Sequence, residues 1–278
     1  MSARTARPEV AETEIPRPPF PWQGWIAAVA VVGLLWWSSM PPPIGTGFNL
    51  REVVEGWPQM QVFFQRLFPT PDRPWPLDYL PQIVNRMTET LKIATAASIF
   101  GAVFALPFAM LAARNLAAGR IVYGFGRGLL NLIRTIPDLV LAALLASAFG
   151  IGPLPGVLAL TIFTFGVVAK LLSDTIETVD PGPQEAITAA GGNRIQQALF
   201  AVFPQVAPDF VAYSLYAFEV NIRAAAFLGY VGAGGIGMIL NRDVKFFNYG
   251  RVGLIITTIF VTVLIIDTVS TTIRRRLV

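Results

Sequence analysis

Long runs without a charged residue constrain this chain more than any other feature of its sequence. No Asp, Glu, Lys or Arg occurs in residues 93–113 or in residues 139–169. A helix needs about 20 mainly apolar residues to cross the hydrocarbon core of a bilayer. Only 14% of the residues are charged, whereas soluble domains average about a quarter. The sequence therefore predicts an all-α membrane protein.

The apolar runs predict about six membrane spans. The run of residues 139–169 holds two of them, because the glycines and prolines of residues 150–156 divide it into a helical hairpin. A cleaved signal peptide is the alternative for the first run, but no small-residue cleavage site precedes the prolines at 41–43. The predicted spans are 24–40, 88–113, a third from near 128, a fourth ending near 169, 205–230 and 252–273.

Charge and composition divide the rest of the chain. Residues 1–23 are predicted to form a cytoplasmic tail, residues 24–80 the first span with an outer amphipathic segment, and residues 81–278 a core of five spans. With both termini on the cytoplasmic side, eleven basic residues flank the inner ends of the spans and seven the outer ends. An excess of Lys and Arg marks the cytoplasmic side, so the bias predicts cytoplasmic N- and C-termini.

The segment 180–204, between the fourth and fifth predicted spans, is too polar to be a span. Pro183 suits the first turn of a short helix, and Gly191 and Gly192 end that helix. A second short helix is expected from Arg194, ended by Pro204. Two short helices at the membrane surface would form a knob suited to docking on another protein. An ordinary interfacial loop is the alternative.

The spacing in this segment resembles the EAA signature of ABC importer permeases. Gly191 follows Glu185 by six residues and Pro204 follows it by nineteen. The departures are Ile187, where a second Ala is usual, and Ala201 and Phe203 at positions that are usually aliphatic. In that family the loop binds the ATPase subunit. The resemblance implies coupling roles for Gln184, Glu185, Ala186, Ala190, Gly191, Arg194 and Pro204.

Other stretches are similar to permeases of the phosphonate importer family. The resemblance covers roughly residues 85–275, and it is carried by residues 134–138, 150–156, 179–183, 218–223 and 229–237. It implies a type I ABC importer permease fold and a homodimer, with two ATPase subunits and an extracytoplasmic binding protein as partners. The substrate would be phosphonate, phosphite or phosphate. ATP and Mg²⁺ would bind to the ATPase, so no cofactor is expected in this chain.

Charged residues inside the predicted spans are candidates for the translocation pathway. A central charge costs roughly 2.5–3.5 kcal/mol on insertion scales, so it is expected to have a partner or a watery path. Glu219 and Arg223 lie four residues apart on one helix face, where they either neutralise each other or present Arg223 to an anion. Arg134 and Asp138 repeat this spacing around Pro137, and form either a structural pair or part of a gate.

Glycines after the fifth predicted span satisfy the GxGxxG spacing of dinucleotide-binding folds. That motif needs a preceding strand and an acidic residue about twenty positions later, and neither is expected here. We interpret the segment as a tight outer turn, where backbones approach closely. It is a candidate outer gate or docking surface for a binding protein. The residues concerned are Gly232, Gly234, Gly235 and Gly237.

Several kinds of site are not expected in this chain. It has no Cys and no His, so neither a metal site nor a set of catalytic residues is predicted. No GxxxxGK[ST] sequence occurs, and the longest Lys/Arg run is three residues beside an apolar helix, which suits a lipid surface better than nucleic acid. The alternatives that remain are a permease for another small solute, an ion-coupled secondary transporter and a membrane enzyme.

Overall fold

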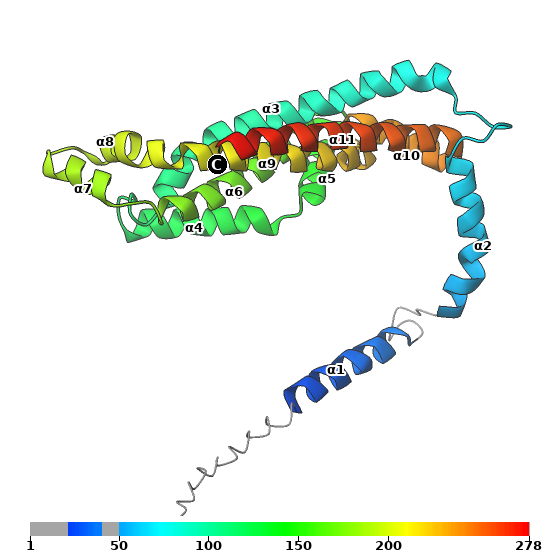
Figure 1. Cartoon of the computed structure of the whole chain (residues 1–278), viewed down its shortest axis with the longest axis horizontal. Helices are drawn as coiled ribbons and strands as arrows, with labels where there is room; N and C mark the ends of the chain where they lie inside the picture. The colour runs from blue at the N-terminus through cyan, green and yellow to red at the C-terminus, as the bar shows by residue number, and fades with distance from the viewer. Residues whose placement is uncertain (1–21, 41–49, 278) are drawn as a thin grey trace, which may run out of the picture. The chain divides into compact units, whose positions relative to one another are not determined.

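The computed structural model describes residues 22–40 and 50–277, which are almost entirely helical (Figure 1). No strand occurs in these two ranges, so the all-α prediction is confirmed. The predicted N-terminal tail lies outside the described residues apart from its last two positions. In chain order the elements are α1 Trp22–Ser38, α2 Leu50–Leu67, η1 Leu77–Tyr79, α3 Leu80–Ala112, α4 Arg120–Thr135, α5 Asp138–Phe149, α6 Pro153–Ile176, α7 Gly182–Ala189, α8 Arg194–Gln196, η2 Gln197–Val202, α9 Phe203–Leu228, η3 Gly229–Val231, α10 Ile236–Lys245 and α11 Tyr249–Leu277.

The chain divides into two units, residues 1–61 and 62–278. The first unit contains α1 and most of α2. α2 is amphipathic, as predicted for part of the outer segment. It ends at Leu67, two residues before Pro69. Its apolar and charged faces suit the surface of a bilayer better than its interior. The second unit contains the remaining elements.

Four helices of the second unit are long and apolar enough to cross a membrane: α3 with η1, α6, the run from α8 to η3, and α11. α4 and α5 pass the same test only as a pair, and they meet at 84°. The third predicted span is therefore divided at Pro137 into two helices. Pro137 lacks an N–H and disfavours helical backbone at the residue before it, and Ile136 is accordingly extended, with ψ of 119°. The first predicted span, α1, is apolar but only 17 residues long.

Small residues let α3 and α6 pack closely at the centre of the second unit. A Cβ on Gly101 of α3 would lie 2.5 Å from the Cβ of Thr164 in α6. Ala94, Ala97 and Ala105 of α3 are fully buried. Small residues let the backbones of helices approach closely, and such packing drives helix association in a membrane. Moving an apolar side chain from lipid into a protein interface gains little free energy by itself.

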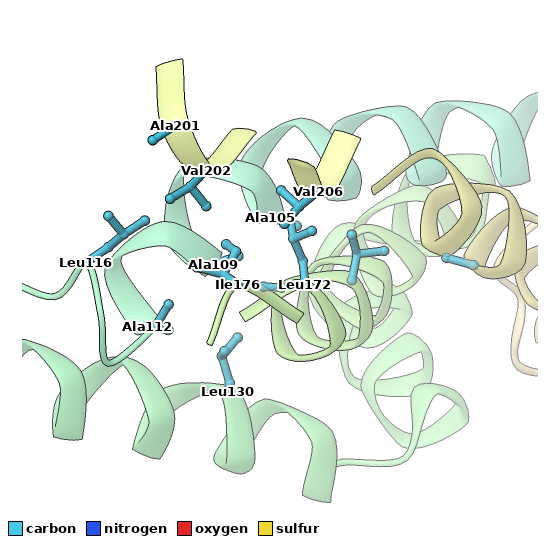
Figure 2. Packing of buried hydrophobic residues seen from close by; sticks show 14 residues of the cluster. Ala105, Ala109, Ala112, Leu116, Leu130, Leu172, Ile176, Ala201, Val202 and Val206 are labelled. Atoms are coloured by element: carbon cyan, nitrogen blue, oxygen red, sulfur yellow. The ribbon is translucent and has the colours of Figure 1, made fainter. Parts of the chain in front are cut away.

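A buried cluster joins this centre to the segment that follows α7. Figure 2 shows Ala105 and Ala109 of α3 beside Leu172 of α6, with Val202 and Val206 above them. All five side chains are fully buried. Because Val202 ends the π-helical segment η2 and Val206 lies in α9, this cluster fixes the start of α9 to the body of the bundle.

Candidate coupling and translocation site

The first helix of the 180–204 segment forms as the sequence predicts. Asp180 precedes α7, and its Oδ1 accepts the Gly182 N–H at 2.9 Å. Pro183 lies in the first turn of the helix, where its missing N–H costs no intrahelical bond. α7 therefore begins where an Asx-type hydrogen bond and a proline favour it.

Two glycines end α7, also as predicted. Gly191 has φ +79°, in the left-handed region that only glycine occupies without penalty. The Gly192 N–H then donates to the carbonyl oxygen of Ile187 at 2.9 Å. A Cβ on Gly192 would lie 2.9 Å from that same oxygen, so the turn requires glycine at both positions.

The second helix does not end at Pro204, contrary to the prediction. It starts at α8 with a reciprocal cap between Asn193 and Gln196, passes through η2, and continues as α9. Pro204 lies in the first turn of α9. η2 is π-helical, and a π-turn changes the hydrogen-bond register of a helix locally. The altered register accommodates Pro204, which has no backbone N–H to donate.

Two side chains of this segment hold it to the α3–α4 connection. Gln184 Nε2 donates to the carbonyl oxygen of Asn115 at 3.2 Å, and Arg194 NH1 donates to that of Ala117 at 2.6 Å. Ile187 packs against the buried cluster. We call residues 180–204 with this connection the anchored loop. Two hydrogen bonds and one packed side chain thus hold the anchored loop to the bundle.

The outward side of α7 carries the carboxylate that the sequence singled out. Glu185, Ala186 and Ala190 are all exposed. The side chain of Glu185 makes no hydrogen bond or ion pair with any described residue. In the same loop, Ile195 is 69% exposed and Phe200 is 71% exposed. The anchored loop thus exposes one carboxylate and two large apolar side chains.

Glu219 and Arg223 do not pair with each other, so that part of the prediction was wrong. Glu219 is buried, and its Oε1 lies 2.6 Å from NH2 of Arg274 on α11. Arg223 is exposed, and its Nε reaches only the backbone carbonyl of Glu219, at 3.4 Å. Because α11 supplies the cation, Arg223 makes no ion pair with any described carboxylate.

The second predicted pair, Arg134 with Asp138, is also wrong. Arg134 is exposed near the end of α4, whereas Asp138 begins α5 after the 84° bend. The i, i+4 spacing brings side chains together only within one continuous helix. Asp138 instead accepts the N–H of Leu139. A role for these four charged residues in a pathway stays a prediction.

The hollow beside Glu219 is small. It measures about 10 Å³, and Arg223 and Asp267 are among the residues that line it. A buried site needs about 10–15 Å³ to hold a single water molecule. The Glu219 region of one chain therefore has no room for a solute, and a pathway there would have to be completed by another chain.

The glycine-rich segment between α9 and α10 forms a tight turn with close backbone contacts. The Gly152 N–H, from the α5–α6 connection, donates to the Gly232 carbonyl at 2.9 Å. A Cβ on Gly237 would lie 2.9 Å from the Cα of Gly229. Left-handed φ occurs at Gly232 (+84°), Gly234 (+85°) and Gly235 (+73°). The role of this turn as an outer gate stays a prediction.

Two side chains of α3 complete this turn. The Ile236 N–H at the start of α10 donates to Thr90 Oγ1 at 2.8 Å, and the Gly235 N–H donates to Glu89 Oε1 at 3.2 Å. Orphan N–H groups at a helix start need such acceptors. Since α9 and η3 precede the turn, its context is helical, and the strand–turn–helix of a dinucleotide site is absent from this described part of the chain.

Sequence reasoning missed a group of ion pairs at the α4–α6 contact. Arg127 of α4 pairs with Asp174 and, at 2.7 Å, with Glu177. Lys170 also pairs with Asp174, at 2.9 Å. The i, i+4 spacing of Lys170 and Asp174 could have indicated their pair. Nothing local in the sequence points to Arg127, which is more than forty residues away.

It also missed two buried polar groups. Asp243 of α10 is 1% exposed and accepts a hydrogen bond from the Tyr79 hydroxyl at 3.0 Å. Asn221 of α9 is fully buried, and its amide donates to Ser98 Oγ at 2.8 Å and to Thr164 Oγ1 at 2.7 Å. Asn221 lies next to Ile222 in an apolar span. A buried polar side chain in such a span needs partners on other helices.

Comparison with known proteins shows which family this chain matches. Residues 105–278, well over half of the chain, match the family described as binding-protein-dependent transport system inner membrane component. This chain belongs to that family. The match includes the anchored loop, the glycine turn and α11. Family membership and the apolar helices together make it a multi-pass membrane protein.

Two relatives of this chain are named as permeases for phosphorus compounds. The phosphite transport system permease protein PtxC of Stutzerimonas stutzeri is 39% identical over 192 residues, which cover 69% of this chain and 70% of PtxC. The phosphate-import permease protein PhnE of Mycolicibacterium smegmatis is 40% identical over 190 residues. Those residues cover 68% of this chain but only 36% of PhnE.

A solved structure of the MetNI methionine ABC transporter in an inward-facing conformation has the same fold. The TM-score is 0.63 at 21% identity, over 73% of this chain and 98% of the MetNI chain. The predicted type I ABC importer permease fold is therefore confirmed.

Proposed function

We propose that this chain is the transmembrane permease subunit of an ATP-driven importer for phosphorus oxyanions. The substrate class is phosphonate, phosphite or phosphate, delivered by an extracytoplasmic binding protein. The names of PtxC and PhnE support this class. A permease for another small solute is the alternative within the same family.

The observation that carries the proposal is the anchored loop with Glu185 at its surface. The carboxylate has no partner among the described residues, while the loop backbone is held by Gln184 and Arg194. A loop that is held to the bundle and exposes both a free carboxylate and apolar side chains suits a groove on an ATPase subunit. We propose that two ATPase subunits bind two such loops, and that ATP and Mg²⁺ bind to them and not to this chain.

The same anchoring suggests how ATP would drive the pore. Closure of the ATPase pair would move both anchored loops, and each loop would carry α3 and α6 with it through the buried cluster. ATP would then shift the population between inward-open and outward-open states, because it binds the closed ATPase pair more tightly than the open pair. This mechanism requires the loop to lie on the cytoplasmic side, and we propose that both termini lie on that side too.

A second copy of the chain would complete the pathway. The face of α9 that carries Arg223 is exposed, and one chain leaves no solute-sized hollow beside Glu219. In a homodimer, two Arg223 side chains from facing α9 helices would line the two-fold axis. Guanidinium groups without a carboxylate partner suit an oxyanion in transit.

Glu185→Arg tests the ATPase coupling. The tagged chain is purified from its native membrane, and we measure the co-purifying ATPase and the uptake of radiolabelled phosphite. Wild type and Asp78→Arg, a matched change at an exposed carboxylate outside the loop, are expected to retain both. Glu185→Arg is expected to lose both, because a cation would replace the carboxylate in the groove. Normal ATPase recovery and normal uptake in Glu185→Arg would reject the coupling proposal.

Substrate class is tested separately by competition. Unlabelled phosphite, phosphate and methylphosphonate are added to the uptake assay, with glycine betaine as a solute of another class. Competition by a phosphorus oxyanion alone would support the proposal. Competition by glycine betaine alone would favour the alternative solute. Uptake that follows an ion gradient and persists without ATP would favour a secondary transporter.

A further inference from the structure

Three arginines line a hollow at the end of the second unit that carries the start of α11. Arg66, Arg73 and Arg251 surround a space of about 470 Å³, within the range of small-molecule sites. Figure 1 shows α7 and α8 at one end of this unit, and α10 with the start of α11 at the other. The remaining lining residues are Pro74, Pro76, Phe247, Asn248, Tyr249 and Gly250.

The positive charge of this hollow is poorly compensated. Arg73 makes no ion pair with a described carboxylate, although Asp72 is its neighbour in sequence. Arg66 makes no ion pair within the described part of the chain, and its guanidinium lies over the Tyr249 ring, 5.9 Å from the ring centre. Arg251 NH1 is 3.9 Å from Oδ1 of Asp243, at the limit of an ion pair. All three guanidinium groups keep donors available.

Both oxygens of the Asp243 carboxylate accept hydrogen bonds from within the chain. Its Oδ2 accepts the Tyr79 hydroxyl at 3.0 Å, and its Oδ1 accepts Asn248 Nδ2 at 3.2 Å. It is also 1% exposed. An incoming anion would therefore meet the arginines without displacing this carboxylate.

Backbone donors add to the same site. At the start of α11, the Val252 N–H donates to the carbonyl of Asn248, the residue before the helix, at 3.0 Å. The N–H groups of Gly250 and Arg251 have no acceptor among the described residues. A Cβ on Gly250 would find only Pro76 Cδ, at 3.8 Å, so the backbone there is open to the hollow. Free N–H groups at the start of a long helix favour an anion.

We propose that this arginine pocket binds a tetrahedral phosphorus oxyanion. The guanidinium groups of Arg66, Arg73 and Arg251 would hold its oxygens, with the first-turn N–H groups of α11 as further donors. The planar guanidinium fork matches two phosphate oxygens at once. The anion is either a free oxyanion or the headgroup of an anionic phospholipid. The pocket is tested by binding alone, so its outcome is independent of the transport proposal.

The test compares wild type with the double variant Arg66→Gln/Arg73→Gln. Both side chains are exposed, and thermal unfolding checks that the variant folds. The control Arg120→Gln/Arg275→Gln removes two exposed charges elsewhere. Each full chain is purified in maltoside detergent without phospholipid, and inorganic phosphate is titrated by calorimetry. In a second arm, phosphatidylglycerol is added and its retention is measured by native mass spectrometry.

Saturable phosphate binding that weakens about tenfold or more in the pocket variant, but not in the control, would support a free oxyanion as ligand. This magnitude corresponds to the loss of one charge-assisted hydrogen bond. The other supporting outcome has two parts. Phosphate does not bind at millimolar concentration, and phosphatidylglycerol is retained by wild type and control but lost from the pocket variant. That result would support a phospholipid headgroup as the ligand. If neither ligand depends on Arg66 and Arg73, the proposal is overturned.

Discussion

The carboxylate of Glu219 pairs at 2.6 Å with Arg274, a residue 55 positions later on α11, and not with Arg223 on the next turn of its own helix. The pair ties α9 to α11 at a position where Glu219 is 6% exposed. It also leaves the guanidinium of Arg223 on the surface, available to a second chain or a solute.

Arg274→Gln is expected to destabilise the protein by about 2 kcal/mol. Breaking a buried ion pair costs about 3–5 kcal/mol because one charge is left uncompensated, and the value is lower here because Arg274 is 31% exposed. Thermal unfolding in detergent measures the effect. Arg223→Gln is the control and is expected to leave the unfolding temperature nearly unchanged. Equal unfolding temperatures for the two variants would contradict the assigned pair.

Gly192→Ala is expected to distort the anchored loop while leaving the bundle folded. The added Cβ would lie 2.9 Å from the Ile187 carbonyl oxygen, closer than real Cβ contacts. Recovery of the ATPase and uptake should fall, with little change in thermal unfolding. Gly128→Ala is the control, because its Cβ meets nothing within 4 Å. Normal ATPase recovery in Gly192→Ala would show that the turn tolerates a side chain.

Thr90→Val is expected to destabilise the glycine turn by about 1–3 kcal/mol. The isosteric change removes the hydroxyl that accepts the buried Ile236 N–H, and an unsatisfied buried donor costs about that much. Thermal unfolding again reports the loss. Thr88→Val on the exposed side of α3 removes a hydroxyl that bonds only within its own helix. If both variants unfold alike, Thr90 does not support the turn.

Asp243→Ala is expected to lower the free energy of unfolding by about 3–6 kcal/mol. It removes a buried carboxylate that accepts bonds from Tyr79 and Asn248, and each hydrogen bond to a charged group contributes about 1.5–3 kcal/mol. Unfolding of detergent-solubilised protein is the measurement, with Asp78→Ala at an exposed carboxylate as the control. A change no larger than that of the control would mean that Asp243 is dispensable.

Local features of the anchored loop could be predicted because they depend on neighbours in sequence. Pro183 and Gly191 act through their own backbone angles, which need no knowledge of the rest of the chain. Pro204 was predicted wrongly because its effect depends on the helix before it. The π-turn of η2, seated on the buried cluster, lets the helix continue where proline alone indicates an end.

The sequence by itself determined that this chain is an all-α membrane protein, with apolar helices and a polar loop between the fourth and fifth predicted spans. Those properties follow from composition and from spacings of a few residues. Composition decides whether a segment is stable in lipid, and short spacings decide which side chains share a helix face. Only the tertiary structure decided which charges pair and whether the helix stops at Pro204. Glu219 meets Arg274, and Arg127 meets Asp174, because separate helices pack side by side. No spacing along the chain encodes such contacts.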